Sequence, residues 1–421
     1  MRRLFGTDGV RGLVGESLTE EFVRDLGQAY STWAGGPRIL IGCDTRSSGP
    51  ALAEALAAGI VDGGGHALDG GILPTAAVAL LSDGHGAVIS ASHNPPEYNG
   101  VKFFREAGQK LADADEEAIE QHLGAESIGG GSMQRIGGLA EAYVDSICAR
   151  FGTSLAGLRV ACDCANGALA GIAGDAFTRL GASVETIGDS PDGANINVGC
   201  GAISPEALGR FVASGDFDLG VAFDGDGDRV MAIDATGEIV DGDQIVAILA
   251  LHLDVDTVAV TIQTNAGFHE LMAERDIRVI TTDVGDRYVA EALRREGAVL
   301  GGEQSGHVIV LDGHSTGDGL AAGLLLCGAM VASGSSLGDL ASVMPRWTQV
   351  KENVPARAKA IPLAVSDVVA TLNAEHAGRA RVLVRPSGTE QLVRVMVESL
   401  DPALAQALLK NAVRLVEGNL A

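Results

Sequence analysis

Proline, lysine and long apolar runs are all scarce in this sequence. Only 12 of the 421 residues are proline, whereas 46% are hydrophobic, a balance that excludes a largely disordered chain. The most apolar run, residues 320–331, is shorter than the roughly 18 residues that a membrane-spanning helix needs. The first residues also lack the apolar stretch of a signal peptide. We therefore predict a folded, cytoplasmic protein with no membrane partner.

Cysteine and nucleotide-binding motifs are limited too. The six cysteines are scattered and form no C-x-x-C pair, which argues against a zinc knuckle and against a disulfide framework. No Walker motif G-x-x-x-x-G-K-[ST] is present, and no G-x-G-x-x-G opens a helix after a strand. The chain is too long for one hydrophobic core, and its length predicts about three or four domains.

Positive charge is scarce relative to negative charge, and the net charge is −25. Such an acidic surface repels nucleic acid, so no nucleic-acid partner is expected. Five of the 30 basic residues are lysine and the rest are arginine, and several of the arginines stand in glycine-rich polar loops. Because a guanidinium can bind two phosphate oxygens at once, we expect a small phosphorylated substrate.

The first candidate site is the segment Ser90–Pro96. It follows an apolar run, Ala87–Ile89, that predicts a short buried strand, and its prolines prevent the strand from continuing. Ser92 would then lie on a loop at a strand end, with His93 and Lys102 close enough in sequence to assist a hydroxyl nucleophile. The alternative is a turn with a solvated serine, because serine, asparagine and proline are ordinary turn residues.

A strand, a helix and a second strand follow one another three times along the chain. Each repeat continues to a further strand that ends in a polar loop, and this alternation predicts α/β layers with sites at the strand ends. The predicted first strands are 38–44, 158–163 and 258–262. The predicted helices are 51–58 and two more that open at 166–168 and 264–267. The predicted second strands lie near residues 67, 184 and 279. The three loops are the Ser92 loop, 224–229 after strand 219–223, and 301–307 after strand 298–300.

The acidic loop at 224–229 is a candidate metal site. Glycines alternate with Asp224, Asp226 and Asp228 and allow the three carboxylates to converge, and converging carboxylates repel one another unless a cation is present. The spacing does not fit an EF-hand, because Arg229 stands where that motif needs glycine. All-oxygen ligation favours Mg²⁺ on a surface loop. A solvated acidic turn is the alternative.

From about residue 345 the pattern changes. Residues 381–384 and 392–398 alternate like half-buried strands, which predicts a smaller α+β domain. The loop between them, 385–390, holds an arginine, two hydroxyls and a glycine whose neighbouring amides can form an anion nest. The alternative for this loop is a plain hairpin turn.

Six motifs follow one another along the chain. They are F-G-T-D-G-V-R-G near the start, S-A-S-H-N-P with N-G-V-K, D-G-D-G-D-R, T-D-V-G-D-R-Y at 282–288, G-G-E-Q-S-G-H and R-P-S-G-T-E. With these motifs the chain resembles the α-D-phosphohexomutases from end to end, and most closely the bacterial phosphoglucosamine mutases. The glucosamine branch is indicated by Gln304, where mannose and glucose enzymes usually have methionine, whereas residues 96–98 look more like those enzymes.

This resemblance implies a fold and a domain layout. The fold class is α/β with four domains around a central cleft, namely three repeated α/β/α layered domains with mixed sheets and a smaller C-terminal α+β domain. The implied domains are 1–138 with the phosphoserine loop, 139–238 with the metal-binding loop, 239–344 with the sugar-binding loop and 345–421 with the phosphate-binding loop.

The resemblance also implies a reaction and its residues. Ser92 would carry a phosphate and give it to a sugar monophosphate, and the resulting sugar 1,6-bisphosphate, which also serves as an activator, would turn over and return its other phosphate to the serine. One Mg²⁺ per chain would be held by Asp224, Asp226, Asp228 and the phosphate on Ser92. Arg11, His93, Lys102 and Arg229 would line the reacting end, with His93 or Lys102 as the general base. Glu303 and Ser305 would hold the sugar hydroxyls, Arg385, Ser387, Gly388 and Thr389 the non-reacting phosphate, and His307, Arg287 and Arg394 would complete the substrate-binding set.

Within the family we predict interconversion of glucosamine 6-phosphate and glucosamine 1-phosphate. The resemblance places that reaction in amino sugar metabolism, on the way to UDP-N-acetylglucosamine and peptidoglycan precursors, and it allows a homodimer. The alternative is a phosphomannomutase/phosphoglucomutase. A non-catalytic sugar-phosphate binding protein is a further hypothesis, against which the intact Ser92 and the three aspartates argue.

Overall fold

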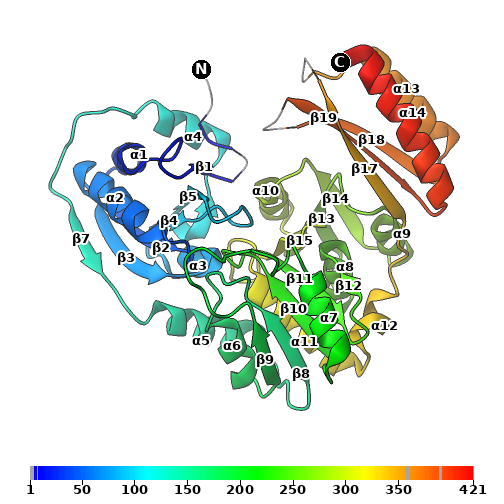
Figure 1. The fold of residues 1–421 in the computed structure, drawn as a ribbon, viewed down its shortest axis with the longest axis horizontal. Helices are drawn as coiled ribbons and strands as arrows, with labels where there is room; N and C mark the ends of the chain where they lie inside the picture. Colours follow the sequence, from blue (N-terminus) through cyan, green and yellow to red (C-terminus); the bar gives the residue numbers. More distant parts are fainter. Residues whose placement is uncertain (1–3, 7, 357–359, 388–390, 421) are drawn as a thin grey trace. The chain divides into compact units, whose positions relative to one another are not determined.

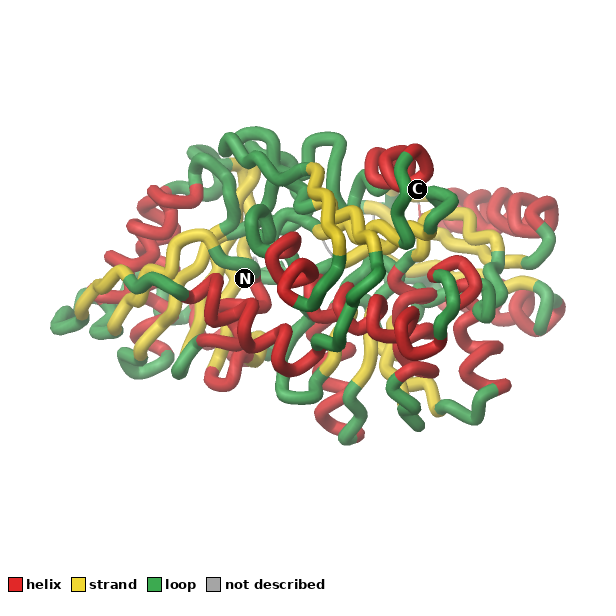
Figure 2. Tube along the Cα trace, turned by 90° about the horizontal axis from the view of Figure 1, so that it is seen from below, coloured by secondary structure: helices red, strands yellow, loops and turns green. Residues whose placement is uncertain are grey.

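The computed structural model describes residues 4–6, 8–356, 360–387 and 391–420. The chain forms two compact units, residues 1–262 with 278–342 and residues 263–277 with 343–421. Strands and helices alternate along the trace (Figures 1 and 2). In the part of the chain that the structure describes, no helix combines the length and the apolar character needed to cross a membrane.

A mixed sheet of seven strands carries the Ser92 loop. Its order is β1-β5-β4-β2-β3-β7, with β6 paired to β5. The strands β4, β2, β3 and β7 are parallel to one another, whereas β5 runs antiparallel to its neighbours β4, β1 and β6. The strands are β1 (Val10–Leu13), β2 (Arg38–Cys43), β3 (His66–Ile72), β4 (His85–Ile89), β5 (Tyr98–Arg105), β6 (Gln109–Lys110) and β7 (Ser132–Arg135).

Helices cover both faces of this first sheet. Because side chains alternate across a strand, Ile41 of β2 belongs to the core beneath two helices while the next residue, Gly42, faces Val78 of a third helix on the other side. The two helices of the first face lie side by side (Figure 1), and Thr19 caps the first of them by accepting a hydrogen bond from the Phe22 amide. The helices of this region are α1 (Glu20–Trp33), α2 (Gly49–Asp62), α3 (Thr75–Leu81), the short η1 (Glu106–Gly108) and α4 (Asp113–Glu120).

Two further mixed sheets have the same layered construction. In the second sheet, Gly220 faces a helix on one side and Val221 faces Gly323 of another helix, and in the third sheet Gly301 and Gly302 face helices on opposite sides. The second sheet contains β8 (Arg159–Asp163), β9 (Ser183–Ile187), β10 (Leu219–Phe223), β11 (Val230–Asp234) and β12 (Ile239–Val240), and the third contains β13 (Thr257–Thr261), β14 (Arg278–Thr282), β15 (Leu300–Gly302) and β16 (Val308–Val310). The helices are α5 (Leu139–Phe151), α6 (Ala173–Arg179), α7 (Glu206–Ser214), α8 (Gly242–His252), α10 (Asp286–Glu296), α11 (Gly319–Ser333) and α12 (Leu337–Ala341).

The three sheets repeat one topology. Each contains the order third, first and second strand, seen as β4-β2-β3, β10-β8-β9 and β15-β13-β14. In each, an antiparallel strand then pairs with the third strand, and the loop between those two strands is the candidate functional loop. The predicted threefold repeat, and the placement of its three loops at one point of that repeat, are therefore confirmed.

Two predicted elements begin elsewhere. The helix expected at 166–168 starts only at Ala173, because Ala165 and Asn166 have φ angles of +53° and +48° and cannot continue a right-handed helix. The strand expected at 298–300 runs instead from Leu300 to Gly302. A Cβ on Gly301 would meet the Ala259 carbonyl oxygen at 2.4 Å, so close packing explains why glycine lies inside this strand.

The second unit is a small α+β body. Its antiparallel sheet, in the order β17-β19-β18, shares one core with two helices. The unit also includes the helix that follows β13 in the chain, because the Asn265 side chain bonds both backbone groups of Trp347 at 3.0 and 3.1 Å. Its elements are α9 (Ala266–Glu274), β17 (Thr348–Pro355), α13 (Leu363–Glu375), β18 (Ala380–Pro386), β19 (Leu392–Ser399) and α14 (Pro402–Leu420).

This architecture confirms the predicted α/β class, with mixed sheets and a smaller C-terminal α+β domain. The four predicted domain boundaries stay predictions, and so does the convergence of all four domains on one cleft.

Candidate active site

Ser92 lies in the turn after β4 and is buried, with 1% of its surface exposed. Its Oγ donates a hydrogen bond of 2.6 Å to Oδ2 of Asp224, a residue far away in the sequence. Nδ1 of His93 lies 3.2 Å from the same Oγ. The solvated-serine alternative is therefore wrong, because the hydroxyl is directed into the protein and against the acidic loop.

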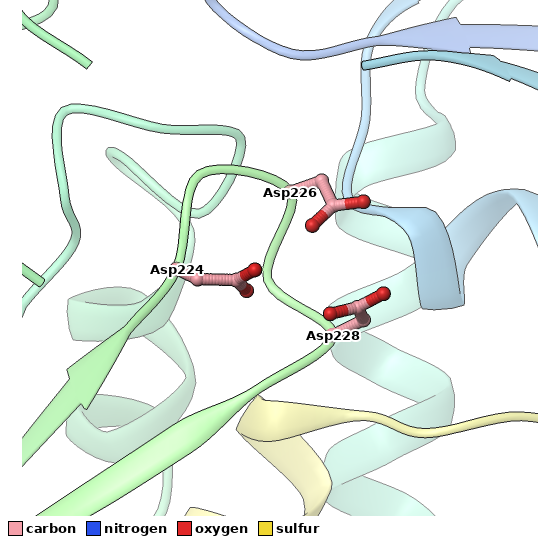
Figure 3. A group of neighbouring side chains, drawn as sticks. All are labelled: Asp224, Asp226 and Asp228. Atoms are coloured by element: carbon pink, nitrogen blue, oxygen red, sulfur yellow. The ribbon is translucent and has the colours of Figure 1, made fainter. Parts of the chain in front are cut away.

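The acidic loop connects β10 to β11, and its three aspartates turn their carboxylates toward one another (Figure 3). One oxygen from each lies within 4.8 Å of the others. All three residues are buried, with exposures of 0% for Asp224, 0% for Asp226 and 2% for Asp228. The expectation of a surface loop was wrong, and so was the solvated-turn alternative. The loop is covered by residues of strand β5 and helix α3, which bond its aspartates.

Close contact between the serine loop and the acidic loop depends on a glycine. A Cβ on Gly225 would lie 2.6 Å from the Ser92 carbonyl oxygen, closer than real Cβ contacts come. Gly227 has a φ of +75°, a conformation that L residues with a side chain rarely adopt. The glycines between the aspartates thus allow both the turn and the approach of the serine.

The aspartates fit a hard divalent cation. Oδ1 of Asp226 and Oδ1 of Asp228 are buried and have no hydrogen-bond partner among the residues that the structure describes, a costly state for a carboxylate oxygen. Burial, together with the charges of Asp228 and Asp226, raises the pKa of Asp224 well above its usual range. Oxygen ligands of this kind suit Mg²⁺ or Ca²⁺, so the structure supports a metal site here.

Lys102 joins the acidic loop to the first sheet. Its Nζ lies 2.7 Å from Oδ2 of Asp226, 3.1 Å from Oδ2 of Asp228 and 2.6 Å from Oδ2 of Asp8. Burial alone would lower the pKa of Lys102, but these carboxylates outweigh it and hold the pKa well above the usual value. His93 behaves oppositely, because burial and the nearby Arg229 lower its pKa to about 4. At neutral pH, Lys102 is an ammonium and His93 a neutral imidazole.

His307 contacts the acidic loop from the third sheet. Its Nε2 lies 3.0 Å from Oδ2 of Asp286, and its Nδ1 lies 3.6 Å from Oδ1 of Asp228. Burial would lower the pKa of His307, but the two aspartates raise it to about 10. Asp286 is also paired with Lys110, which bonds Asp8 at 2.7 Å. A continuous chain of ion pairs therefore links the first and third sheets beside the acidic loop.

The loop between β15 and β16 is bonded to the second sheet through its backbone and to the segment between β14 and α10 through the Glu303 side chain. Gly306 accepts a hydrogen bond of 2.9 Å from the Val230 amide, directly after the acidic loop. Oε1 of Glu303 accepts one of 3.0 Å from the Gly285 amide, and burial raises the pKa of this carboxyl group. Glu303 and Ser305 are half-buried, so both side chains are available to a polar ligand.

Three predicted arginines have different surroundings. Arg11 bonds Asp8 at 2.6 Å and reaches Oδ1 of Asn94 in the serine loop at 3.2 Å. Arg229 donates its backbone N–H to Oδ1 of Asp224 at 3.1 Å. Arg287 lies between α10 and α4, where its guanidinium bonds Asp113 at 2.7 Å and Glu116 at 3.1 Å. Arg11 and Arg229 thus border the serine and the triad, whereas the described contacts of Arg287 link two helices.

The second unit holds the remaining predicted residues. Arg385 of β18 and Arg394 of β19 are direct partners in the strand register. Ser387 is buried, and its N–H donates to the Leu392 carbonyl at 2.9 Å. Gly388 and Thr389 lie outside the described residues. The strands predicted around this loop are confirmed, and its role in binding phosphate stays a prediction.

Thr75 and Arg46 are among the residues that support the site directly although the sequence did not indicate them. Thr75 at the start of α3 donates its hydroxyl to Oδ2 of Asp226 at 2.6 Å and its N–H to the Asp226 carbonyl at 2.9 Å. Arg46, after β2, donates to several backbone carbonyls of the serine loop. Neither residue lies in one of the candidate loops. The only sequence signal for either is that Arg46 stands in a polar turn at the end of a strand.

Comparison with known proteins agrees with this arrangement. Four phosphoglucomutase/phosphomannomutase family models match in succession: alpha/beta/alpha domains I, II and III at residues 2–128, 141–237 and 241–347, and the C-terminal domain at 348–415. The phosphoglucosamine mutase of Moorella thermoacetica is 44% identical over 443 aligned residues, which cover 99% of this chain and 100% of that protein.

Solved structures share the whole fold. A phosphoglucomutase/phosphomannomutase family protein from Burkholderia thailandensis superposes with a TM-score of 0.86 at 24% identity, covering 100% of this chain and 99% of that one. The N-acetylphosphoglucosamine mutase of Aspergillus fumigatus, in complex with GlcNAc-6P and magnesium, gives a TM-score of 0.70 at 16% identity, covering 99% and 95%. With four family models in order along its length and a full-length relative at 44% identity, the chain belongs to the phosphoglucomutase/phosphomannomutase family, the α-D-phosphohexomutases.

Proposed function

We propose that this protein is a phosphosugar mutase that interconverts glucosamine 6-phosphate and glucosamine 1-phosphate. The observation that carries the proposal is the 2.6 Å hydrogen bond from the buried Ser92 Oγ to Asp224, within a triad of aspartates that fits a cation. The 44% identity to a phosphoglucosamine mutase over the full length supports the choice of sugar.

Ser92 carries the phosphate in this mechanism. The free hydroxyl of the sugar monophosphate attacks the phosphorus, the P–Oγ bond breaks, and a sugar 1,6-bisphosphate forms. The hydroxyl proton passes to a base, and of the two predicted candidates His93 is the neutral one, 3.2 Å from Oγ. As the P–Oγ bond breaks, Ser92 Oγ takes up the proton that His93 has accepted. After the bisphosphate turns over, Ser92 Oγ attacks the phosphorus of its other phosphate, and the bond between that phosphorus and the sugar oxygen breaks. The Oγ proton passes to His93, which then gives it to the departing sugar oxygen.

The charge on the transferring group is balanced by residues around the serine. Asp224, Asp226 and Asp228, with the phosphate on Ser92, would hold one Mg²⁺, which when bound withdraws charge from the phosphoryl oxygens. Arg11, which reaches Asn94 of the serine loop, and Arg229, whose Nε lies 3.9 Å from Oδ1 of Asp228, supply fixed positive charge at the same place.

The sugar is recognised by the loop that contains Glu303. An ammonium at C2 near this carboxylate gains a charge-assisted hydrogen bond that a hydroxyl cannot equal. Ser305 bonds sugar hydroxyls, with His307 and Arg287 in supporting roles, and Arg385, Ser387, Gly388, Thr389 and Arg394 hold the non-reacting phosphate. A phosphomannomutase/phosphoglucomutase remains the second candidate, because residues 96–98 resemble those enzymes. A cytoplasmic location and a homodimer remain predictions from the sequence.

A side-by-side assay tests the proposal. The purified protein is supplied with the 6-phosphates of glucosamine, glucose and mannose and the matching bisphosphates, and kcat/KM is measured for each. We expect the highest value for glucosamine 6-phosphate. An equal or higher value for mannose or glucose would favour the second candidate, and no turnover of any of the three would leave a binding protein.

The phosphate carrier is tested in the same preparation. Intact-mass and peptide analysis should find one phosphate on Ser92 in part of the wild-type sample. Ser92→Ala should fold and lose most activity, whereas the control Ser214→Ala, an exposed serine at the end of α7, should keep both activity and phosphate. Wild-type turnover by Ser92→Ala would contradict the mechanism.

A further inference from the structure

Arg46 lies in the turn between β2 and α2, and its side chain is completely buried. Its Nε bonds Oδ2 of Asp44 at 2.9 Å. Its two terminal nitrogens donate to four backbone carbonyls of the segment that follows β4, namely those of Ser92 at 3.0 Å, Asn94 at 2.7 Å, Tyr98 at 2.9 Å and Pro95. One guanidinium therefore binds the backbone of the serine loop along most of its length.

The backbone of Ser92 itself needs such support. Its φ of +52° is uncommon for a residue with a side chain, and such conformations persist only where the surroundings impose them. The Ser92 N–H donates to Oγ of Ser90 at 2.8 Å, and that hydroxyl donates to Oδ2 of Asp44 at 2.6 Å. The Ser92 carbonyl accepts from Arg46 and, at 2.9 Å, from Nδ2 of Asn197. Both backbone groups of the serine thus end in one network centred on Asp44 and Arg46.

We propose that Arg46 is a positioning residue that holds the Ser92 loop in the shape that places Oγ against Asp224. Its partners are Asp44 and the loop backbone, so it acts through the loop and not on the reacting atoms. The inference rests on the proposed function of Ser92 as the phosphate carrier. The β2–α2 turn thus contributes to catalysis although it is not one of the candidate loops.

The geometry requires an arginine. A guanidinium is a rigid planar fork with five N–H donors, whereas a lysine ammonium offers three donors from a single point. Lysine can keep the charge next to Asp44, but it cannot reach four separate carbonyls. Arg46→Lys should therefore preserve the ion pair and lose the shape of the loop.

Asn197 bonds the same Ser92 carbonyl and belongs to a segment that follows β9 of the second sheet. Replacing Asn197 therefore disturbs this carbonyl more mildly than replacing Arg46. Its φ is +60°, a conformation that glycine adopts without strain. Asn197→Gly therefore removes the donor to the Ser92 carbonyl while the backbone keeps its path. The matched control is Asp254→Gly, because Asp254 is exposed, has a φ of +51° and lies at the end of α8.

The first experiment measures kcat and KM per folded molecule for Arg46→Lys, Arg46→Gly, Asn197→Gly and Asp254→Gly. Loss of positioning should lower kcat by about tenfold or more in both Arg46 variants and by a smaller factor in Asn197→Gly, with KM close to wild type. Guanidinium ion at low millimolar concentration should restore part of the kcat of Arg46→Gly alone. Asp254→Gly should match wild type.

A purely structural role gives different results. It would lower the melting temperature and the folded fraction, leave kcat per folded molecule unchanged and give no guanidinium rescue. Wild-type kcat in Arg46→Lys would overturn the proposal. If neither Arg46 variant folds, Asn197→Gly decides, because unchanged kcat in that variant would overturn it as well.

Amide hydrogen exchange separates this proposal from the proposed function. Exchange in the peptide 90–98 should become faster in Arg46→Lys and Asn197→Gly and stay unchanged elsewhere in the sheet, whether or not the protein turns over sugar phosphates. Unchanged exchange in that peptide would overturn the positioning role. An inactive wild-type protein would instead overturn the phosphate-carrier assignment.

Discussion

Replacing Gly225 with alanine should separate the serine loop from the metal loop. The added Cβ would lie 2.6 Å from the Ser92 carbonyl oxygen, 2.7 Å from Nδ2 of Asn197 and 2.9 Å from Ile196, whereas ordinary contact begins at 3.4 Å. The φ of Gly225 is not in the left-handed region, so the change introduces crowding without backbone strain. The carbonyl must then move by about 0.8 Å, and because a misplacement of about 1 Å can cost a hundredfold in rate, we expect kcat to fall by about 10- to 100-fold.

The assay is mutase turnover at saturating substrate and Mg²⁺, with the folded fraction measured by circular dichroism. Gly137→Ala is the matched control, because Gly137 is exposed and its Cβ would meet nothing within 4 Å. KM should change little, because the displaced atoms belong to the serine loop. A Gly225→Ala enzyme with the kcat of wild type would refute the idea that the 2.6 Å contact between Ser92 and Asp224 sets the reacting geometry.

Three further predictions concern the metal, the distal arginine and pH. Because the aspartates are buried, chelation should stop turnover and also lower the melting temperature. Mg²⁺ at 100 times its Kd should restore about 2.7 kcal/mol of the free energy of unfolding. Asp226→Asn should lose this dependence on Mg²⁺, and a wild-type melting temperature that does not respond to Mg²⁺ would contradict the metal assignment. Arg385→Lys should raise KM, because about 1.5–3 kcal/mol of binding free energy is lost with one charged hydrogen bond, and it should release more free bisphosphate. An unchanged KM with no extra release would show that this arginine does not hold the phosphate. The pKa of His307 is raised to about 10 in the folded protein. Its ion pairs therefore stabilise the protein fully below about pH 6.5, and this stabilisation is lost as the pH rises through about 10. Chelator-treated wild type should lose stability over that range, whereas His307→Gln should not.

The sequence predicts the repeat and its three loops well because these features are local. A buried strand marks the end of β4 at Ile89, where a polar loop with two prolines follows, and of β10 at Phe223, where a polar, glycine-rich loop follows; the observed strands end at those residues. Asp224 and Ser92 are 132 residues apart, yet both were placed at strand ends of equivalent repeats. A repeated topology brings equivalent loops to equivalent places, which is why the pairing could be anticipated.

Burial and long-range support could not be predicted in the same way. An acidic, glycine-rich loop has the composition of a solvated turn, and its burial involves Thr75 of helix α3 and Lys102 of strand β5, both distant in the sequence. Arg46 acts through backbone carbonyls, which have no sequence signature. Gly301 lies inside a strand because a neighbouring backbone comes close, a reason that depends on the partner strand and not on the residue itself.

The inclusion of α9 in the second unit determines how this protein can be divided experimentally. A chain cut at residue 344 would keep α9 but lose the Trp347 backbone that bonds Asn265 and the Arg381 side chain that bonds the Thr264 carbonyl. Residues 263–277 would therefore have to be excised as well. Joining residue 262 directly to 278 is not feasible, because β13 and β14 are parallel neighbours and the two cut ends lie at opposite ends of the sheet. A viable first unit needs a designed crossover in place of α9, so the C-terminal unit cannot be removed by simple truncation.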